Sequence, residues 1–247
     1  MNTNKTTARR AATSPLFYAR AAGLVYLIAL PFMVFSFAYV SSTLIVPGDA
    51  AATANNIMAS EGLFRSGIVS WLIGQTVFML LPLVLYKLLK PVNKSHAVLM
   101  VIFLLVSVPI AFINELNQFA VLFLLSGADY LTAFEVDQLH AQVMLFLDLH
   151  EHGILIAGIF WGLWLLPLGF LVLKSGFLPR TLGVLLIIGS FGYVLDSLTG
   201  LLFPDYKAIV SQIVIVPNFI SEFALNMWLL IKGVNVEQWE KRALESA

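Results

Sequence analysis

Five carboxylate side chains lie inside or at the edge of long apolar segments, where carboxylates are rare. They are Glu115, Asp148, Glu151, Asp196 and Glu222. A carboxylate in hydrocarbon costs several kcal/mol unless it lines a cavity, is paired or is protonated. No Lys or Arg is expected among these acids within the apolar interior, so His150 and His152 are the candidate partner bases. The pattern predicts a polar site within an apolar interior.

Three of these residues are spaced for metal binding. Asp148, Glu151 and His152 are three and four residues apart, so one face of a helix would carry all of them. Carboxylate and imidazole ligands suit zinc or another divalent metal, and Glu115 or Asp196 from a neighbouring helix would complete the set. A divalent metal is the one cofactor that the sequence suggests. The same three residues also fit a helix end with solvated charges.

Glu222 is the acid predicted to lie deepest, about 15 Å from the Lys232 end of its segment at ~1.5 Å per residue. Asn218 lies one turn away on the same face. One role is a structural acid that bonds to an asparagine and locks the bundle. Another is a site for protons, a cation or the polar group of a ligand.

These acids are predicted to line one outward-facing pocket, because they come from different helices and fall mainly in the outer half. The residues expected to line it are Glu115, His150, His152, Asp196, Asn218 and Glu222. Acids outnumber bases among them, which favours a small ligand, a cation or protons as the occupant. Two alternatives stay open. One is an intramembrane hydrolase that uses a metal-activated water on lipid. The other is a non-catalytic scaffold or partner subunit.

Two other residue types bear on this pocket. Trp161 and Trp164 fit either packing or an aromatic wall of a ligand site. Arg65 would be a cation near the pocket, and we expect it to anchor its span instead. No serine nucleophile motif, phosphate loop or dinucleotide fingerprint occurs in the sequence.

Composition places the chain in the membrane. It has 247 residues, of which 60% are hydrophobic and 11% charged, and its mean hydropathy is +0.90. A soluble domain is about half apolar and a quarter charged. The formal net charge of zero gives no basic surface for nucleic acid. The absence of cysteine excludes disulfides, thiolate metal sites and cysteine nucleophiles.

Six apolar segments are long enough to cross a bilayer, whose hydrocarbon core needs about 20 residues. They are residues 20–43, 66–86, 97–125, 152–173, 181–203 and 208–231. A lipid-exposed backbone must satisfy its own hydrogen bonds, so the expected fold is an all-α bundle. The first segment follows Lys5, Arg9 and Arg10, as in a signal peptide. Its apolar run exceeds the ~7–15 residues of a signal core, so we expect a retained span.

The basic residues predict the orientation. Twelve of the 14 Lys and Arg residues fall on one side, and only Arg65 and Lys207 fall on the other. Positively charged loops face the cytoplasm, which predicts a protein of the cytoplasmic membrane with both termini on the cytoplasmic side. The expected organisation is a tail over 1–19, a membrane domain over 20–233 and a second tail over 234–247. The lipid bilayer is the expected partner, with a small cation or lipid as ligand and no nucleic acid.

The outer loops raise two further questions. Each has an apolar end, a breaker and then Asp49, Asp129 or Asp205, which fits three helix N-caps or an old triplication of a helical hairpin. Short interfacial helices are expected in these loops and around Trp239. Residues 136–174 would make one helix about 58 Å long, so it either projects from the membrane or breaks near Gly153.

Short motifs along the chain resemble a known family. They are residues 45–49 (IVPGD), 89–93 (LKPVN), 126–130 (SGADY), 147–150 (LDLH), 174–176 (KSG), 178–180 (LPR), 183–186 (GVLL), 228–230 (WLL) and 232–233 (KG). Over residues 20–233 the chain resembles the bacterial multi-pass family catalogued as domain of unknown function 4386. The resemblance implies a prokaryotic cytoplasmic-membrane protein and no particular activity. His150 matches the family pattern, whereas Trp164 stands where a histidine is expected, which argues against a two-histidine metal site.

Overall fold

The computed structural model describes residues 14–246, and these form helices joined by short loops, without a strand among them. Six helices within this range are long and apolar enough to cross a membrane. They are Pro15–Leu44, Glu61–Leu89, Lys94–Leu124, Val136–Ser175, Arg180–Leu202 and Pro204–Ile231. The predicted all-α bundle of six spans is confirmed. The protein is therefore a multi-pass membrane protein that associates with a lipid bilayer. The expected tail over residues 1–19 lies largely outside the described residues.

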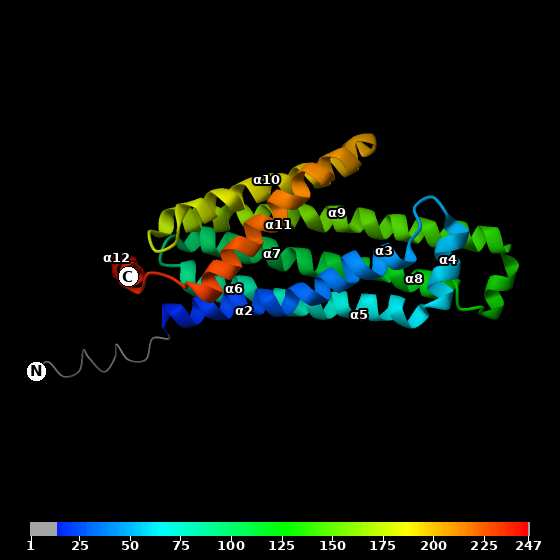
Figure 1. The fold of residues 1–247 in the computed structure, drawn as a ribbon, viewed down its shortest axis with the longest axis horizontal. Helices are drawn as coiled ribbons and strands as arrows, with labels where there is room; N and C mark the ends of the chain where they lie inside the picture. Colours follow the sequence, from blue (N-terminus) through cyan, green and yellow to red (C-terminus); the bar gives the residue numbers. More distant parts are fainter. Residues whose placement is uncertain (1–13, 247) are drawn as a thin grey trace, which may run out of the picture.

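Several spans are built from more than one helical piece (Figure 1). The helices are α2 (Pro15–Val34), η1 (Phe35–Val40), α3 (Ser41–Leu44), α4 (Ala50–Ala59), α5 (Glu61–Phe78), α6 (Leu81–Leu89), α7 (Lys94–Asn114), α8 (Leu116–Leu124), η2 (Asp129–Ala133), α9 (Val136–Ser175), α10 (Arg180–Leu202), η3 (Pro204–Tyr206), α11 (Lys207–Ile231) and α12 (Val236–Glu245).

The two ends of the bundle differ in charge, as the sequence predicts. One end, called the basic end below, carries the start of α2, helix α12 and the loops with Lys90, Lys174 and Arg180 (Figure 1). The opposite end, called the acidic end, carries α4, η2 and η3 with Asp49, Asp129 and Asp205. Which end faces the cytoplasm stays a prediction from the charge pattern.

Prolines account for several helix irregularities. Pro31 lies inside α2, and the next turns form the π-helix η1. Proline lacks the N–H that would continue the i→i−4 ladder, and π-turns are frequent at functional sites. Pro82 starts α6 after a break at residues 79–80, and Pro109 lies six residues before the break at Glu115. Pro167 and Pro217 remain within continuous helices.

Helix α9 is continuous over 40 residues, which makes it about 60 Å long and far longer than a ~30 Å hydrocarbon core. It therefore projects beyond the membrane at the acidic end. The alternative prediction, that the helix breaks near Gly153, is wrong. Gly153 serves close packing instead, because the Asn114 side chain occupies the position of a Cβ there. A hydrophobic cluster packs against the projecting part of α9. It includes Val40, Leu44, Ile57, Phe64, Val121, Val143 and Leu147.

The loop predictions have mixed outcomes. The helix expected after Asp49 is α4, and the Asp49 carboxylate caps it by accepting from the Ala52 N–H at 2.8 Å. Asp129 and Asp205 lie inside the 3-10 helices η2 and η3, so the N-cap interpretation is wrong for both. The helix expected around Trp239 is α12, and the Trp239 indole N–H donates to the Leu88 carbonyl at 2.8 Å.

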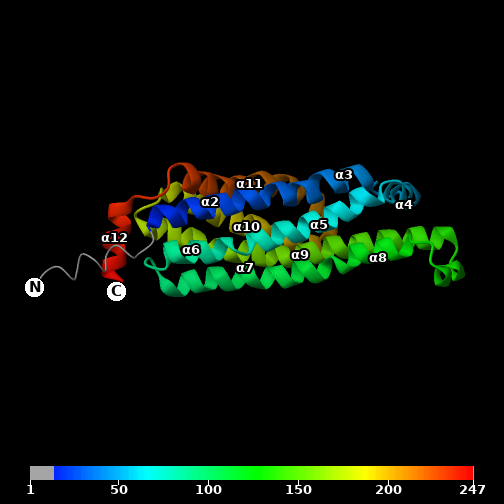
Figure 2. The same cartoon turned by 90° about the horizontal axis from the view of Figure 1, so that it is seen from below.

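The first and last spans touch at one end and separate at the other. Near the basic end, Gly23 of α2 lies so close to the Asn226 carbonyl and Leu230 of α11 that a Cβ on it would collide with both. Small residues let the backbones of membrane helices approach closely. The resulting van der Waals contacts stabilise their packing, because lipid provides no hydrophobic driving force. Toward the acidic end, α10 and α11 diverge from α9 and from the first span (Figure 1). Figure 2 shows α11 next to α2 near the basic end, where the two helices are in contact.

Candidate functional site

A cavity of about 910 Å³ lies where the α10–α11 hairpin diverges from the other helices. Its walls come from α2, η1, α3, α5, α9, α10 and α11, with Gln118 of α8 near the acidic end. Most of its lining side chains are apolar. Polar groups gather at two places, called the floor and the rim below. The floor consists of Tyr26, Trp71, Phe78, Trp161, Trp164, Tyr193 and Glu222. The rim consists of Gln118, Asp148, His150, Glu151, Asp196, Lys207 and Ser211.

Glu222 is the polar centre of the floor. It is buried and lies nine residues before Ile231, which places it about 14 Å from the basic end of α11. The Tyr193 hydroxyl of α10 donates to its Oε1 atom at 2.9 Å. The other carboxylate oxygen accepts no hydrogen bond from the residues that the structure describes. Glu222 thus lies near the middle of the bilayer, and one of its two carboxylate oxygens accepts no hydrogen bond from the described residues.

Close packing of α10 against α11 positions Glu222. The Ser221 hydroxyl and the Asn218 side chain press against Gly189 and Gly192, where a Cβ would not fit. In the amide orientation that satisfies its hydrogen bonds, Asn218 donates to the carbonyls of Gly189 and Val214, both at 3.2 Å. These contacts fix the rotation of α11 and direct Glu222 toward Tyr193. Asn218 therefore supports the floor. No asparagine side chain among the described residues bonds to the Glu222 carboxylate, and the Asn226 amide donates to the Glu222 backbone carbonyl at 2.9 Å instead.

Aromatic rings form the rest of the floor. They fall into two groups of three, and the rings within each group are in contact. Trp161 packs edge-on against Trp71 and Tyr193, with ring centroids 6.2 and 6.3 Å apart. Phe78 packs against Tyr26 at 6.2 Å and against Trp164 at 6.0 Å. All six rings line the cavity. Trp161 and Trp164 therefore belong to its wall, and the Trp71 indole nitrogen is buried without an acceptor among the described residues.

The rim contains an ion pair that the sequence did not reveal. Lys207 Nζ lies 3.3 Å from Asp196 Oδ2, and both side chains are about three-quarters buried. Ser211 bonds to both, since its hydroxyl donates to Asp196 Oδ1 and accepts from Lys207 Nζ at 2.9 Å. The expectation that only histidines are near these acids is wrong. The short η3 turn folds α11 back along α10, which brings Lys207 beside Asp196 although 11 residues separate them.

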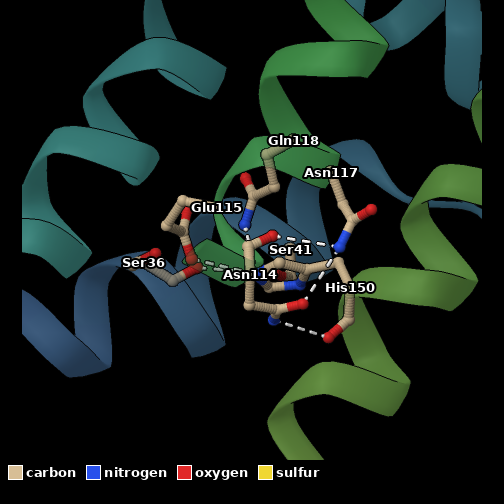
Figure 3. Close-up of polar contacts among 7 residues, drawn as sticks. All are labelled: Ser36, Ser41, Asn114, Glu115, Asn117, Gln118 and His150. Atoms are coloured by element: carbon tan, nitrogen blue, oxygen red, sulfur yellow. Dashed lines mark hydrogen bonds and ion pairs between the residues drawn. The ribbon is translucent and has the colours of Figure 1, made fainter. Parts of the chain in front are cut away.

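A second polar group ties the third span to α9 beside the rim (Figure 3). Glu115 is 1% exposed, and its Oε1 atom lies 3.0 Å from His150 Nε2. Gln118 Nε2 lies 3.0 Å from the same His150 nitrogen. Asn114 donates to the His150 carbonyl at 2.8 Å, and Asn117 donates to the Asn114 side chain at 3.0 Å.

The His150 ring cannot satisfy both neighbours with one proton arrangement. A protonated Nε2 donates to Glu115, whereas an unprotonated Nε2 accepts from Gln118. The buried Glu115 carboxylate needs the donor more, because its Oε2 atom has no partner among the described residues. We therefore assign the Nε2 proton to the bond with Glu115.

The proposed metal ligands do not converge. Asp148, Glu151 and His152 are exposed, and the His152 ring bonds to the Asp148 backbone carbonyl at 2.8 Å instead of joining its carboxylate. Within residues 14–246 no group of three or more His, Cys, Asp or Glu side chains could hold a metal ion. Arg65 lies away from the cavity and pairs with Glu61 at 2.6 Å, consistent with the anchoring role.

The structure brings four of the six predicted pocket residues to one cavity: His150, Asp196, Asn218 and Glu222. Glu115 lies directly behind His150, and His152 points elsewhere. Sequence reasoning missed Lys207, Ser211 and Tyr193. Tyr193 shares a helix face with Asp196, which is a signal that the spacing contains.

Comparison with known proteins agrees with the motif-based resemblance. The chain is 35% identical over 150 residues to a protein of Archaeoglobus fulgidus described as an uncharacterized protein, a match that covers 60% of this chain and 72% of the archaeal one. No solved structure matches the chain. A family model described as "Domain of unknown function (DUF4386)" matches residues 21–233. The chain therefore belongs to the DUF4386 family.

Proposed function

We propose that this protein binds one amphipathic, lipid-like molecule in the cavity between α2–η1 and the α10–α11 hairpin. The observation that carries the proposal is the cavity itself, which is large and mostly apolar and has its charged groups at the floor and the rim. Ligand pockets typically span about 300–1,000 Å³ and combine apolar walls with a few polar groups. An alkyl chain suits the walls, and polar groups of the ligand suit the two polar ends.

The bilayer is the expected source of this molecule. Side chains that line the cavity are also largely exposed on the outside of the bundle, namely Phe37 of η1 and Ile215, Val216 and Phe219 of α11. A cavity wall with such exposed residues on two facing helices supports lateral entry from the hydrocarbon. The charge pattern supports an orientation in which the rim faces outward from a prokaryotic cytoplasmic membrane.

This function accounts for the cavity better than the other two hypotheses. A metal-dependent hydrolase requires a converging ligand set, and the described residues offer none. A scaffold has no need of a large cavity, because interiors are otherwise close-packed. The diverging α10–α11 hairpin instead keeps space open between well-packed helices.

Photolabelling in lipid nanodiscs tests this function. The probe is a neutral long-chain alcohol with a diazirine on its chain, and labelled positions are mapped by peptide mass spectrometry. We expect labelling of cavity residues such as Ile154 and Val214, in addition to the lipid-facing belt. Ile154→Trp fills the cavity and should remove the cavity labels. Ile156→Trp is the matched control, because Ile156 lies two residues away on the exposed side of α9.

Labels confined to belt residues such as Ile102, Ile113 and Leu166 would contradict the proposal. Equal cavity labelling in Ile154→Trp and Ile156→Trp would contradict it as well. In both cases the probe would be reporting the surrounding lipid and not an internal site.

A further inference from the structure

We infer that the cavity floor binds the positively charged group of the ligand, so that the ligand is an alkylammonium amphiphile with its head inward. This inference rests on the proposed function and names the ligand class for the same cavity. It places the cationic head beside Glu222 and the alkyl chain along the apolar walls toward η1 and α11.

The first argument is the charge balance of the floor. Glu222 lines the cavity and is buried, and its carboxylate accepts a single hydrogen bond among the described residues, from Tyr193. Among the described residues the only Lys or Arg that lines the cavity is Lys207, which lies at the rim and already pairs with Asp196. A buried carboxylate without a cationic partner is costly in hydrocarbon. A ligand cation would supply that partner.

The second argument is the set of rings around this carboxylate. Tyr26, Trp71, Trp161 and Tyr193 line the floor with Glu222, and the ring of Tyr193 connects Trp161 to the carboxylate. Aromatic faces attract cations, most strongly where water is excluded, and aromatic cages recognise quaternary ammonium groups. A floor of rings around one acid matches an ammonium group with apolar substituents better than a small hydrated metal ion.

The third argument is that the floor's hydrogen bonding is incomplete. The Trp71 indole nitrogen is buried without an acceptor among the described residues, and one oxygen of the cavity-lining Glu222 has no donor among them. Buried polar groups are normally satisfied, and each exception needs an explanation. A bound molecule at the floor provides one.

The rim is the competing place for a cationic head. Asp148 and Glu151 line the rim but are exposed, so water and salt screen their charges. The two locations make opposite predictions for charge-removing variants, and an experiment can separate them.

Competition against the neutral photoprobe provides that experiment. The competitors are dodecyltrimethylammonium and its neutral isostere, in which carbon replaces the nitrogen, both added to nanodiscs of zwitterionic lipid. Wild-type protein should prefer the cation by about tenfold or more, which corresponds to about 1.4 kcal/mol. Glu222→Gln should remove that preference, measured as the ratio of the two affinities within each variant. The double variant Asp148→Asn/Glu151→Gln is the matched control and should retain the preference.

Trp161→Leu gives a second test that leaves the carboxylate in place. It should reduce the ratio of the affinities for the cation and the neutral isostere, and this result stands even if Glu222→Gln fails to fold. Equal affinity of wild-type protein for the two competitors would overturn the inference. Loss of the preference in the rim double variant, with retention in Glu222→Gln, would overturn it as well. If the neutral probe does not enter the cavity at all, the proposed function fails first.

Discussion

Tyr193 of α10 and Glu222 of α11 meet at the cavity floor, where the phenolic hydroxyl donates to the carboxylate at 2.9 Å. This is the only hydrogen bond that the Glu222 carboxylate accepts within the described part of the chain, since the Asn226 amide donates to the Glu222 backbone carbonyl instead. It joins the two helices whose divergence from the bundle leaves the cavity open. Under the proposed function, we expect stability and ligand binding to be coupled at this contact.

Replacing Tyr193 with Phe should destabilise the protein, because the buried carboxylate loses its donor. Interhelical hydrogen bonds in membrane proteins contribute about 0.6 kcal/mol on average and up to about 1.7 kcal/mol. We expect a lower thermal midpoint for ligand-free Tyr193→Phe in nanodiscs. Tyr206→Phe is the control, since Tyr206 is exposed. Equal midpoints for the two variants would show that the Tyr193–Glu222 bond contributes nothing.

The Glu115–His150 pair should be strongly coupled. His150→Leu leaves a buried carboxylate without its partner, and breaking a buried pair in this way typically costs about 3–5 kcal/mol. Adding Glu115→Leu should recover part of this loss, which a double-mutant cycle measures by equilibrium unfolding. His152→Leu is the control, because His152 is exposed and bonds to a backbone carbonyl. Additive effects of the Glu115 and His150 substitutions would contradict the pairing.

The Asp196–Lys207 pair should contribute less, because both side chains are about one-quarter exposed and therefore partly screened. Lys207→Met should lower the free energy of unfolding by about 1 kcal/mol, a loss that shrinks at high salt. Arg65→Met removes the exposed pair with Glu61 and should have almost no effect. A larger effect from Arg65→Met than from Lys207→Met would rule out this role for Lys207.

Gly23→Ala should weaken the contact between the first and last spans. A Cβ at this position collides with the Asn226 carbonyl and with Leu230 of α11, so the helices must separate. Overpacking of this kind typically costs about 1–3 kcal/mol. Gly62→Ala is the control, since no atom lies near its Cβ position and alanine favours the helix. Thermal unfolding of the two variants should change in opposite directions.

The sequence alone determined the class and course of the chain. The lengths and hydropathy of the apolar segments predicted all six spans, because a bilayer of fixed thickness requires about 20 apolar residues in a self-bonded helix. The cap at Asp49 and the helix around Trp239 also followed from local chemistry. These features depend on residues close together in the chain.

Only the tertiary structure decided which side chains meet. The pairs Asp196–Lys207, Glu115–His150 and Tyr193–Glu222 each join different helices. Their formation depends on the rotation, tilt and closest approach of those helices, which interhelical packing sets. Hydropathy carries no information about these variables, since it measures how apolar a segment is and not which faces of two helices pack together. The cavity is the clearest case, because it exists only where α11 leaves the first span beyond Gly23.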